Sequence, residues 1–541
     1  MDRRDFVKGA AALTATAATG IGHAQESGGR VAKRSILTAT AQFDPARPEI
    51  ARVVAQSCKS LGWEVEANPI DYNQGITKVI NEHDFEMFLV FLPGTAIRID
   101  PDFFIRSVHH SGEYKRGGFN WAGYKNDRVD ALAAVQSRMM NFNDRWKPVF
   151  EAQKVIYEDQ PGTVLAYTQM TMAHRSDKLK GLVPQLGEGI GGFWSDINME
   201  VVGDGFSRTG SNADVKHLNP VAVNDSMEFM ELSMIYDRLF RLGPDGKPVP
   251  WAASAMKLVD DKTIDLTIRS GMRWHDGKPV TTEDVKFTFD YHKKWKAPFF
   301  LTALNNVVSV ELPSANTVRI RLENPSAPFV SNVMATMFLL PKHIWEGIPD
   351  KAGIDDPLKF PNDKPIGSGP FKFDYWRRGS ELKVSAFREH FNPPKCAGII
   401  RITYGSHDAL AAAIEKGECD RSRYIVSPAL VDRLKSVKNI VAKGYPSHGL
   451  YHLAYNNKIK PFDDPAFRQA LNYVMPRKMI SELILLGYAD PGASVISPIN
   501  AFWHNPAVKV PAEDVKKARD MLAKAGYGWD TQGKLLSPRG K

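Results

Sequence analysis

The stretch that decides the fold is Thr267-Ile268-Arg269-Ser270-Gly271-Met272-Arg273-Trp274-His275-Asp276-Gly277-Lys278-Pro279-Val280-Thr281, followed by Glu283-Asp284-Val285-Lys286-Phe287-Thr288. Alternating apolar and polar residues over 258–269 predict a strand that leads into it. A turn follows. Thr281-Thr282-Glu283-Asp284 then offers a capping hydroxyl and early acidic residues, as the start of a helix requires. The stretch therefore predicts a strand, a turn and a helix beginning near Thr282.

The same alternation of strand and helix patterns runs through the first part of the chain. Strand-like segments at 35–41, 63–68 and 86–92 are separated by helical spacing at 48–61 and 76–82. This βαβαβ order predicts parallel strands joined by crossover helices. The pattern further predicts helices at 129–140 and 146–158, strands at 163–167, 317–322, 371–373 and 382–387, and a mostly helical segment over the last 80 residues.

The bulk numbers describe an ordinary globular chain. It has 541 residues, of which 43% are hydrophobic and 24% charged, with a net charge of +9. That length predicts roughly two to four domains. Basic and acidic residues are interleaved, which is typical of a solvated surface and not of a nucleic-acid footprint. The spacing of the three cysteines predicts neither a disulfide framework nor a metal site. It leaves undecided whether Cys396 and Cys419 form a disulfide.

The first 24 residues are typical of an export signal. Arg3-Arg4-Asp5-Phe6-Val7-Lys8 is a twin-arginine motif, a mildly apolar stretch follows, and Gly22-His23-Ala24 offers small residues for cleavage. The apolar stretch is too short for a transmembrane span. We therefore expect a mature protein in the periplasm.

Motifs that resemble catalytic or metal sites are weak. Residues 187–192 fit G-x-G-x-x-G, but Pro184 precedes them and no convincing helix follows. His109 and His110 are adjacent and do not share a face, and aspartates beside prolines more often shape turns. We expect no enzyme, no catalytic residue, no metal and no cofactor.

The opening stretch closely resembles the signature of the dipeptide/oligopeptide/nickel-binding family of extracellular solute-binding proteins, also called family 5 of the ABC transporter substrate-binding proteins. Further segments are similar to landmarks of the same family. They are Leu218-Asn219-Pro220, Ile235-Tyr236-Asp237-Arg238-Leu239, Pro341-Lys342-His343, Gly367-Ser368-Gly369-Pro370-Phe371, Tyr455-Asn456-Asn457, Pro461-Phe462-Asp463-Asp464 and Arg468-Gln469-Ala470-Leu471.

The order of the segments differs from the family. Its Trp-His-Asp-Gly segment lies in the first third, and the segment that here reads Asn120-Trp121-Ala122-Gly123-Tyr124 lies near the end. In this chain the late part comes first, at about 30–200, and the early and middle parts follow, at about 204–541. The simplest account is a circular permutation, and a rearranged gene product is the alternative. The resemblance implies an α/β, two-lobed periplasmic-binding-protein type II fold, with mixed sheets flanked by helices and a hinge, circularly permuted.

The permuted arrangement predicts the domains. They are an export signal at 1–24, a C-terminal-type lobe from 30–165 plus 447–541 that holds the new termini, an N-terminal-type lobe from 166–250 plus 345–446, an extra subdomain at 251–344, and a linker at 185–215 that joins the ancestral termini.

The resemblance implies a monomer that captures a small organic, peptide-like ligand between its lobes and delivers it to the permease subunits of an ABC importer in the inner membrane. It implies no partnership with nucleic acid. A ligand sensor for a membrane receptor, or a periplasmic enzyme on the same fold, is the alternative.

Ligand-facing residues are carried over from the family. The turn Asn224-Asp225-Ser226 matches a segment that lines the cleft, with a plain helix-capping turn as the alternative. Tyr72 lies where an aromatic residue often meets ligand, with core packing as the alternative. Tyr451 and Asn456 lie near the lobe crossing, with a strand-pairing role as the alternative.

One difference between this sequence and the family's peptide binders concerns the ligand. Peptide binders of the family place an Asp, which pairs with the ligand's α-amine, three residues before the motif that reads Asp100-Pro101-Asp102. That position is Ile97 here, and Arg98 follows. Arg98 could pair with a carboxylate or phosphate. We therefore expect an N-blocked peptide-like ligand, or an acidic or sugar-type one.

Overall fold

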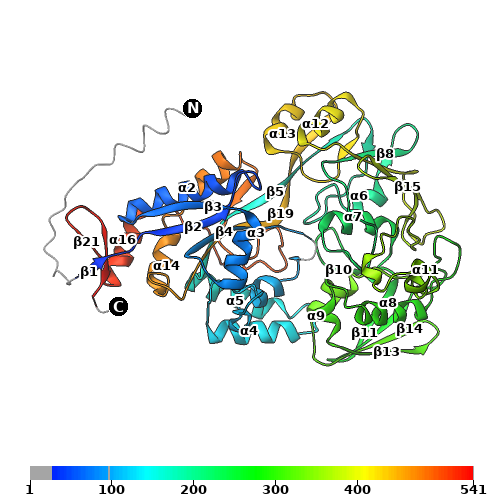
Figure 1. Cartoon of the computed structure of the whole chain (residues 1–541), viewed down its shortest axis with the longest axis horizontal. Coiled ribbons are helices and arrows are strands. Elements are labelled where there is room, and N and C mark those ends of the chain that lie inside the picture. The colour runs from blue at the N-terminus through cyan, green and yellow to red at the C-terminus, as the bar shows by residue number, and fades with distance from the viewer. Residues whose placement is uncertain (1–26, 96–97, 540–541) are drawn as a thin grey trace.

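The computed structural model describes residues 27–95 and 98–539. The chain is an α/β protein whose described part forms two bodies side by side (Figure 1). No described helix is long and apolar enough to cross a membrane. The predicted export signal lies outside the described residues.

Half of the described strands belong to one mixed sheet of 11 strands, ordered β15-β16-β17-β8-β18-β5-β19-β4-β2-β3, with β20 also paired to β5. Its members are β2 (Arg34–Ala39), β3 (Val65–Ile70), β4 (Met87–Leu92), β5 (Gly162–Arg175), β8 (Phe206–Ser211), β15 (Phe371–Arg377), β16 (Glu381–Ala386), β17 (Gly398–Thr403), β18 (Arg421–Ser422), β19 (Ile440–Tyr455) and β20 (Ala489–Pro491).

Four smaller sheets complete the described strands. A four-stranded antiparallel sheet has the order β11-β12-β14-β13, and a three-stranded one has the order β1-β22-β21. The members are β1 (Ser27–Arg30), β6 (Leu179–Lys180), β7 (Glu200–Val201), β9 (Phe240–Leu242), β10 (Pro248–Pro250), β11 (Ala253–Asp260), β12 (Thr263–Ile268), β13 (Val307–Ser314), β14 (Thr317–Leu322), β21 (Gly528–Trp529) and β22 (Leu535–Pro538).

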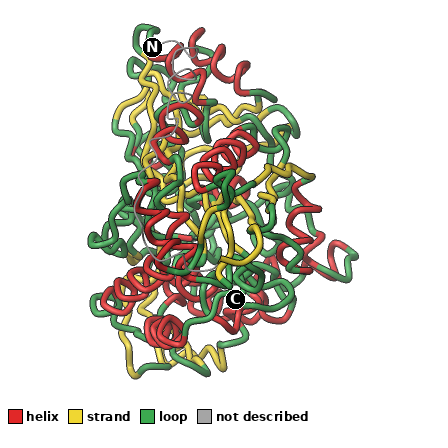
Figure 2. The backbone as a smooth tube through the Cα atoms, turned by 90° about the vertical axis from the view of Figure 1, so that its left-hand side faces the viewer, coloured by secondary structure: helices red, strands yellow, loops and turns green. Residues whose placement is uncertain are grey.

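Helices lie on both sides of the strands (Figure 2). The α-helices are α2 (Ala46–Cys58), α3 (Tyr72–Ile76), α4 (Asp127–Arg138), α5 (Trp146–Asp159), α6 (Phe193–Asn198), α7 (Ser226–Ile235), α8 (Thr282–Lys294), α9 (Leu301–Leu304), α10 (Lys342–Trp345), α11 (Ile348–Ala352), α12 (His407–Lys416), α13 (Pro428–Lys435), α14 (Pro465–Asn472), α15 (Arg477–Met479) and α16 (Val515–Lys524). Short 3₁₀ and π segments are η1 (Lys59–Leu61), η2 (Thr77–Glu82), η4 (Phe103–Ser107), η5 (Ser111–Glu113), η6 (Val330–Met334), η7 (Pro357–Lys359) and η8 (Ile480–Ile484).

The predicted parallel βαβαβ unit is present. Strand β2 pairs in parallel with β3 on one side and with β4 on the other. Successive residues of a strand point to opposite faces of the sheet. Ile36 accordingly packs in one hydrophobic cluster with α2, α14 and α16, whereas Leu37 packs in another with α4 and α5. Both faces of this part of the sheet are therefore buried.

The hydrophobic clusters divide the described residues into two parts. The buried members of two clusters fall within 36–167 and 450–535, and those of the others fall within 170–445, with Ile99 the one exception. We call residues 27–167 with 450–538 the split lobe, and residues 168–446 the continuous lobe. The chain passes between them twice, within β5 and within β19, and these two strands pair antiparallel along both lobes.

Near the two ends of the described chain, β1 and β22 pair antiparallel, with Ser27 opposite Pro538 and Arg30 opposite Leu536. Arg30 also donates to Asp530 Oδ2 at 2.7 Å. Segments more than 500 residues apart in the sequence therefore lie side by side in the split lobe.

The opening stretch folds as predicted from its helix onward. Helix α8 begins at Thr282, and the Asp284 carboxylate accepts from both the amide and the hydroxyl of Thr281 at 2.9 Å. The single strand expected over 258–269 is instead the hairpin β11–β12, because Asp261 and Lys262 form a turn. Strand β14 covers 317–322 as expected.

Two other expectations were wrong, and a third was right but too short. The strand expected at 163–167 is present as part of the longer β5, which ends only at Arg175. The last 80 residues hold short helices and long irregular segments, because prolines and glycines interrupt them. The segment 185–215 is no plain surface connection, since Leu186, Ile190 and Phe193 are buried in it and α6 and β8 form within it.

Cys396 and Cys419 are buried free thiols and form no disulfide.

The buried histidines make stability depend on pH. His109, His292 and His448 are at most 2% exposed and His452 is 4% exposed, and burial lowers the pKa of the first three to about 4 and that of His452 to about 3. These rings stay neutral in the folded protein. The unfolded chain protonates them as the pH falls through about 6.5, so it binds more protons and gains free energy.

We therefore expect the free energy of unfolding to fall as the pH is lowered from 6.5 toward 4. Each of these histidines contributes a loss that approaches about 1.4 kcal/mol for every pH unit below 6.5. Urea unfolding at pH 7.5, 6.5 and 5.5 measures this loss. An unfolding free energy that stayed constant down to pH 5.5 would contradict it.

Candidate ligand-binding site

Three loops meet at one edge of the split lobe's sheet. The loops after β2, β3 and β4 begin at Thr40, Asp71 and Pro93, and the three strands are parallel neighbours. The carboxyl ends of parallel strands share one edge, and ligands of open α/β sheets bind outside it. This rule brings Phe43, Tyr72 and Arg98 to one place.

Arg98 is a half-buried cation without a carboxylate partner. Its Nη1 donates to the Pro93 carbonyl at 3.2 Å, and its guanidinium lies 5.0 Å from the centre of the Phe103 ring. No carboxylate of the described residues lies within salt-bridge distance of it. Burial lowers the pKa of the Arg98 guanidinium, and the nearby Tyr72 opposes that effect only in part. The neighbouring Ile97 lies outside the described residues.

Tyr72 stacks on an exposed aromatic ring. The rings of Tyr72 and Phe43 lie 4.0 Å apart and are almost parallel, and Phe43 is 53% exposed. The Arg47 guanidinium lies 5.6 Å from the centre of the Tyr72 ring and donates to Asp44 Oδ2 at 2.9 Å. The Tyr451 hydroxyl donates to the same carboxylate at 3.2 Å. Asp44 and Arg47 therefore connect Tyr72 to Tyr451.

The crossing strand β19 touches the loop after β4 without intervening side chains. A Cβ on Gly94 would lie 2.2 Å from the Gly449 amide nitrogen, so only glycine allows this approach. His448 bonds through Nε2 to the Thr95 carbonyl at 2.9 Å. Arg98 lies near enough to His448 to lower its pKa further. The candidate site thus borders the strands that join the two lobes.

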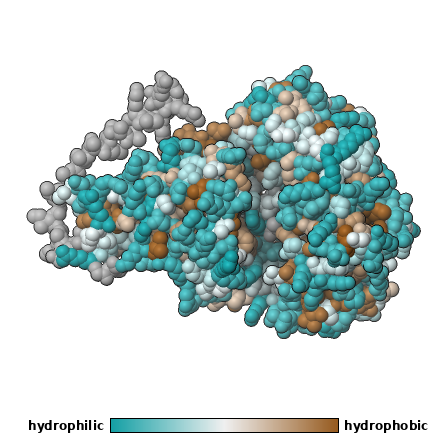
Figure 3. All heavy atoms as spheres, viewed as in Figure 1, coloured by the Kyte–Doolittle hydropathy of each residue, from teal (hydrophilic) through white to brown (hydrophobic). Residues whose placement is uncertain are grey.

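The continuous lobe presses a loop against this edge. A Cβ on Gly187 would lie 2.4 Å from the Gly94 carbonyl oxygen, and one on Gly246 would lie 2.9 Å from Ile99. Away from the crossing strands, the Ala327 amide donates to the Ser137 carbonyl at 2.8 Å, which joins the lobes a second time. Between these contacts the surface is hollowed along the line where the lobes meet (Figure 3).

The turn Asn224-Asp225-Ser226 serves as a helix cap. Asp225 accepts from the amides of Met227 and Glu228 at 2.9 Å each, at the start of α7. Asn224 is exposed, and its amide donates to the Glu228 carboxylate at 3.2 Å. These contacts match the capping alternative for Asp225, and a ligand-binding role for the turn stays a prediction.

Asn456 does not join the other predicted residues. It lies just beyond β19, where its Nδ2 donates to the Phe85 carbonyl at 2.9 Å and its Oδ1 accepts from the Lys458 amide at 3.1 Å. Its side chain is therefore engaged by backbone groups. Tyr72, Arg98 and Tyr451 are the predicted residues that lie at or beside the shared edge.

Phe43, Asp44 and Arg47 at this edge were not foreseen, nor was Gly187 in the facing loop. Phe43 and Asp44 could have been found from the rule that loops after parallel strands meet. The contact of Gly187 could not, because this residue belongs to a segment interpreted as a linker.

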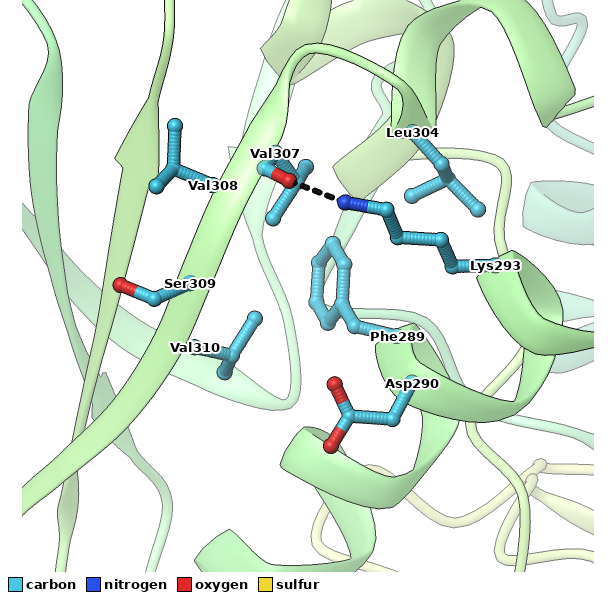
Figure 4. Close-up of a pocket in the computed structure, with 8 residues that line it drawn as sticks. All are labelled: Phe289, Asp290, Lys293, Leu304, Val307, Val308, Ser309 and Val310. Carbon is cyan, nitrogen blue, oxygen red and sulfur yellow. Dashed lines mark hydrogen bonds between the residues drawn. The ribbon is translucent and has the colours of Figure 1, made fainter.

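Two small cavities lie away from this edge. One of about 30 Å³ is lined by Phe289 and by residues of β13, and it is bridged by Lys293, whose Nζ donates to the Val307 carbonyl at 2.6 Å (Figure 4). The other, of about 10 Å³, is lined in part by Gln185, Glu188 and Arg238. Neither is large enough for a small organic ligand, whose pocket typically measures about 300–1,000 Å³.

The G-x-G-x-x-G match at 187–192 is followed by helix α6, contrary to expectation. This helix has only six residues, and an irregular turn in place of a strand precedes the glycines. The strand-to-helix turn that cradles a dinucleotide is therefore not formed. The described residues hold no group of three or more His, Cys, Asp or Glu side chains placed to bind a metal.

Comparison with known families matches two parts of the chain. The sequence model of the bacterial extracellular solute-binding proteins, family 5, middle region, matches residues 247–539. The model of the twin-arginine translocation pathway signal matches residues 1–20. The protein is therefore exported to the periplasm.

Curated relatives match over part of their length. The glutathione-binding protein GsiB of Shigella flexneri serotype 5b (strain 8401) is 27% identical over 318 residues, which are 57% of this chain and 59% of that protein. The dipeptide-binding protein of Escherichia coli (strain K12) is 27% identical over 314 residues, which are 54% and 58% of the two chains. The chain thus spans less than two thirds of the length of these relatives.

Solved structures match to a similar extent. The ABC transporter substrate-binding protein CtaP of Listeria monocytogenes has a TM-score of 0.50 and 26% identity, covering 61% of this chain and 67% of that chain. A periplasmic oligopeptide-binding protein of Thermotoga maritima has a TM-score of 0.50 and 22% identity, covering 62% and 66%. The latter likeness concerns the fold alone.

Proposed function

Since this chain belongs to the family 5 bacterial extracellular solute-binding proteins, we propose that it captures a small peptide-like ligand between the split lobe and the continuous lobe. It then delivers this ligand to the permease subunits of an ABC importer. The ligand carries an acidic group, and Arg98 binds that group.

The observation that carries the proposal is the unpaired guanidinium of Arg98 at the edge where the lobes meet. A half-buried cation that lacks a counter-charge loses favourable interactions with water, and no charged partner replaces them. A carboxylate of the ligand restores the balance through two parallel hydrogen bonds, which guanidinium geometry favours. The binding free energy of the acid is thereby largest when the lobes close over it and exclude water.

Closure couples binding to delivery. A ligand that touches both lobes stabilises the closed arrangement over the open one, and its differential affinity sets how far the equilibrium shifts. The exposed Phe43 ring, stacked on Tyr72, offers an apolar face beside Arg98. A peptide-like ligand can use such a face for its side chain while its carboxylate meets the guanidinium.

Replacement of Arg98 by alanine should remove the preference for an acidic ligand. The probes are two pools of N-acetylated random tripeptides, one with free C-terminal carboxylates and one with C-terminal amides. Wild-type protein should retain the carboxylate pool at least about tenfold better, since a charged, desolvated pair contributes more than about 1.4 kcal/mol. Mass spectrometry of the retained peptides, after removal of unbound material, gives the ratio.

The matched control is Arg106→Ala, because Arg106 already pairs with Asp102 at 2.7 Å. It should keep the carboxylate preference, whereas Arg98→Ala should bring the ratio close to one. Retention of both pools equally by wild-type protein, or an unchanged ratio in Arg98→Ala, would refute the role of Arg98. Retention of neither pool would refute a peptide-like ligand.

We further propose that the chain is a circularly permuted, two-lobed member of its family. The pairing of β1 with β22 supports this, because joining them would restore the usual order of segments in the split lobe. The turn at 202–205, between β7 and β8, marks the ancestral termini. It is exposed at Val202, and Gly203 and Gly205 adopt positive φ. Breaks in exposed turns cost few contacts.

A chain rebuilt in the other order tests this proposal. Residues 204–538 would be followed by a short linker and residues 27–201. We expect it to fold and to retain the same peptides as the original chain, with a melting temperature changed by only a few degrees. A rebuilt chain that stayed unfolded, or that folded without retaining peptide, would contradict the permutation.

A further inference from the structure

We infer that Ile99 is a positioning residue: by inserting its side chain into the continuous lobe, it holds Arg98 in the geometry that binds the ligand's acid. The inference rests on the proposed function and adds to it the contact that connects the meeting of the lobes to the alignment of the guanidinium. Ile99 acts through its neighbour in the chain and needs no contact with the ligand.

The side chain of Ile99 belongs to the core of the opposite lobe. Ile99 is 2% exposed, and among the described residues it is the one buried residue of the split lobe that joins a hydrophobic cluster of the continuous lobe. A Cβ on Gly246 would lie 2.9 Å from Ile99 Cγ2 and 3.0 Å from Leu186 Cδ2, so the Gly246 backbone packs against both side chains. The Leu186 amide donates to the Pro244 carbonyl at 2.9 Å. The loop and the turn that surround Ile99 are therefore joined to each other.

The main chain of Ile99 belongs to the split lobe. Its carbonyl accepts a hydrogen bond from Nδ2 of Asn500 at 2.9 Å. The next residue, Asp100, is held by Arg145, which donates to both oxygens of the Asp100 carboxylate at 2.8 and 2.6 Å. All of these contacts lie within the split lobe. Ile99 therefore connects the two lobes through a single residue, with its main chain in one and its side chain in the other.

Arg98 lies between two contacts with the continuous lobe. Before it in the chain, the Gly94 carbonyl oxygen lies 2.4 Å from the position that a Cβ of Gly187 would occupy. After it comes Ile99. The Arg98 amide also donates to the Thr95 carbonyl at 2.9 Å, which ties it to the residue that follows Gly94. The main chain that carries the guanidinium is therefore placed by both lobes.

The side chain of Arg98 has little else to align it. Its Nη1 makes one hydrogen bond, to the Pro93 carbonyl at 3.2 Å, and its guanidinium lies 5.0 Å from the centre of the Phe103 ring. A long side chain loses rotamer freedom when it binds a carboxylate through two hydrogen bonds, and less freedom is lost when its main chain is already fixed. Without the contact of Ile99, the ligand's acid has to order the main chain as well as the guanidinium, so its binding is weaker.

The test compares the two pools of N-acetylated tripeptides, with C-terminal carboxylates and with C-terminal amides, because only the first pool uses Arg98. Weaker closure of the lobes would lower the retention of both pools by the same factor and leave their ratio unchanged, whereas misplacement of Arg98 lowers the ratio. Wild-type protein should favour the carboxylate pool at least about tenfold, and Ile99→Ala should reduce this preference to about twofold or less. Ile99→Val removes less of the side chain and should lie between the two.

The residue that faces Ile99 offers an independent variant. Leu186→Ala removes the opposite side of the contact, and Leu186 lies in the other lobe from Arg98. It should lower the carboxylate preference in the same direction. The double variant Ile99→Ala with Leu186→Ala should lower the preference no further than the stronger single variant, because both substitutions remove the same contact.

Ile156→Ala is the matched control, because Ile156 is 3% exposed and packs in a hydrophobic cluster of the split lobe alone. It should lower the melting temperature and keep the wild-type preference. A preference that survives in both Ile99→Ala and Leu186→Ala, or that falls as far in Ile156→Ala, would overturn this inference and leave the proposed function standing. Equal retention of the two pools by wild-type protein would overturn the proposed role of Arg98 and this inference with it.

Discussion

The antiparallel pair of β5 and β19 is the constraint on which the rest of the structure depends. These are the strands in which the chain passes between the lobes, and they stay paired from Ile440 opposite Arg175 to Ala454 opposite Gly162. The register shifts between Pro446 and Leu450, which is where the hydrophobic clusters change. The chain therefore passes from one lobe to the other within a few residues of this strand. The close approach of Gly94 and Gly449 fixes the candidate site beside that point.

The hydrogen-bond partners of the buried arginines show why Arg98 is a candidate ligand-binding residue. Arg145 forms two hydrogen bonds with the Asp100 carboxylate, and Arg421 pairs with Asp196. Arg477, which forms no salt bridge with a carboxylate of the described residues, donates to the carbonyls of Val164, Gly492 and Asn472. The fold thus compensates these three guanidinium groups with a carboxylate or with several carbonyls. The Arg98 guanidinium has a single hydrogen bond to a carbonyl, which distinguishes Arg98 from these three arginines.

Much of the fold could be predicted from the sequence because local patterns were decisive. The alternation around β2, β3 and β4 fixed their parallel pairing, and Thr281 with Asp284 fixed the start of α8. Strand β5 was predicted too short, because its second half mixes polar and apolar residues without the alternation that marks a strand. Residues 185–198 were misjudged because their glycines resemble a linker, although Leu186, Ile190 and Phe193 are held in hydrophobic clusters by distant strands.

The candidate site was only partly predictable for a similar reason. Tyr72 and Arg98 follow strands that could be recognised, so their meeting at one edge follows from topology. Asn456 is adjacent to a family landmark in sequence, but its amide is used by the turn that contains it. Gly187 approaches Gly94 beside the site only because the two lobes meet. That contact depends on tertiary packing and leaves no periodic signal.

The central claim is that the two lobes close and enclose the ligand. A measurement of the distance between the lobes tests this claim most directly. Spin labels can be placed at Lys125→Cys in the split lobe and Lys257→Cys in the continuous lobe, both exposed positions, because the three native cysteines are buried. Protein purified with its native ligand should give one short, narrow distance distribution. Protein unfolded, washed and refolded should give a longer and broader one, and adding back the extracted small molecules should restore the first. Identical distributions in all three states would contradict the account.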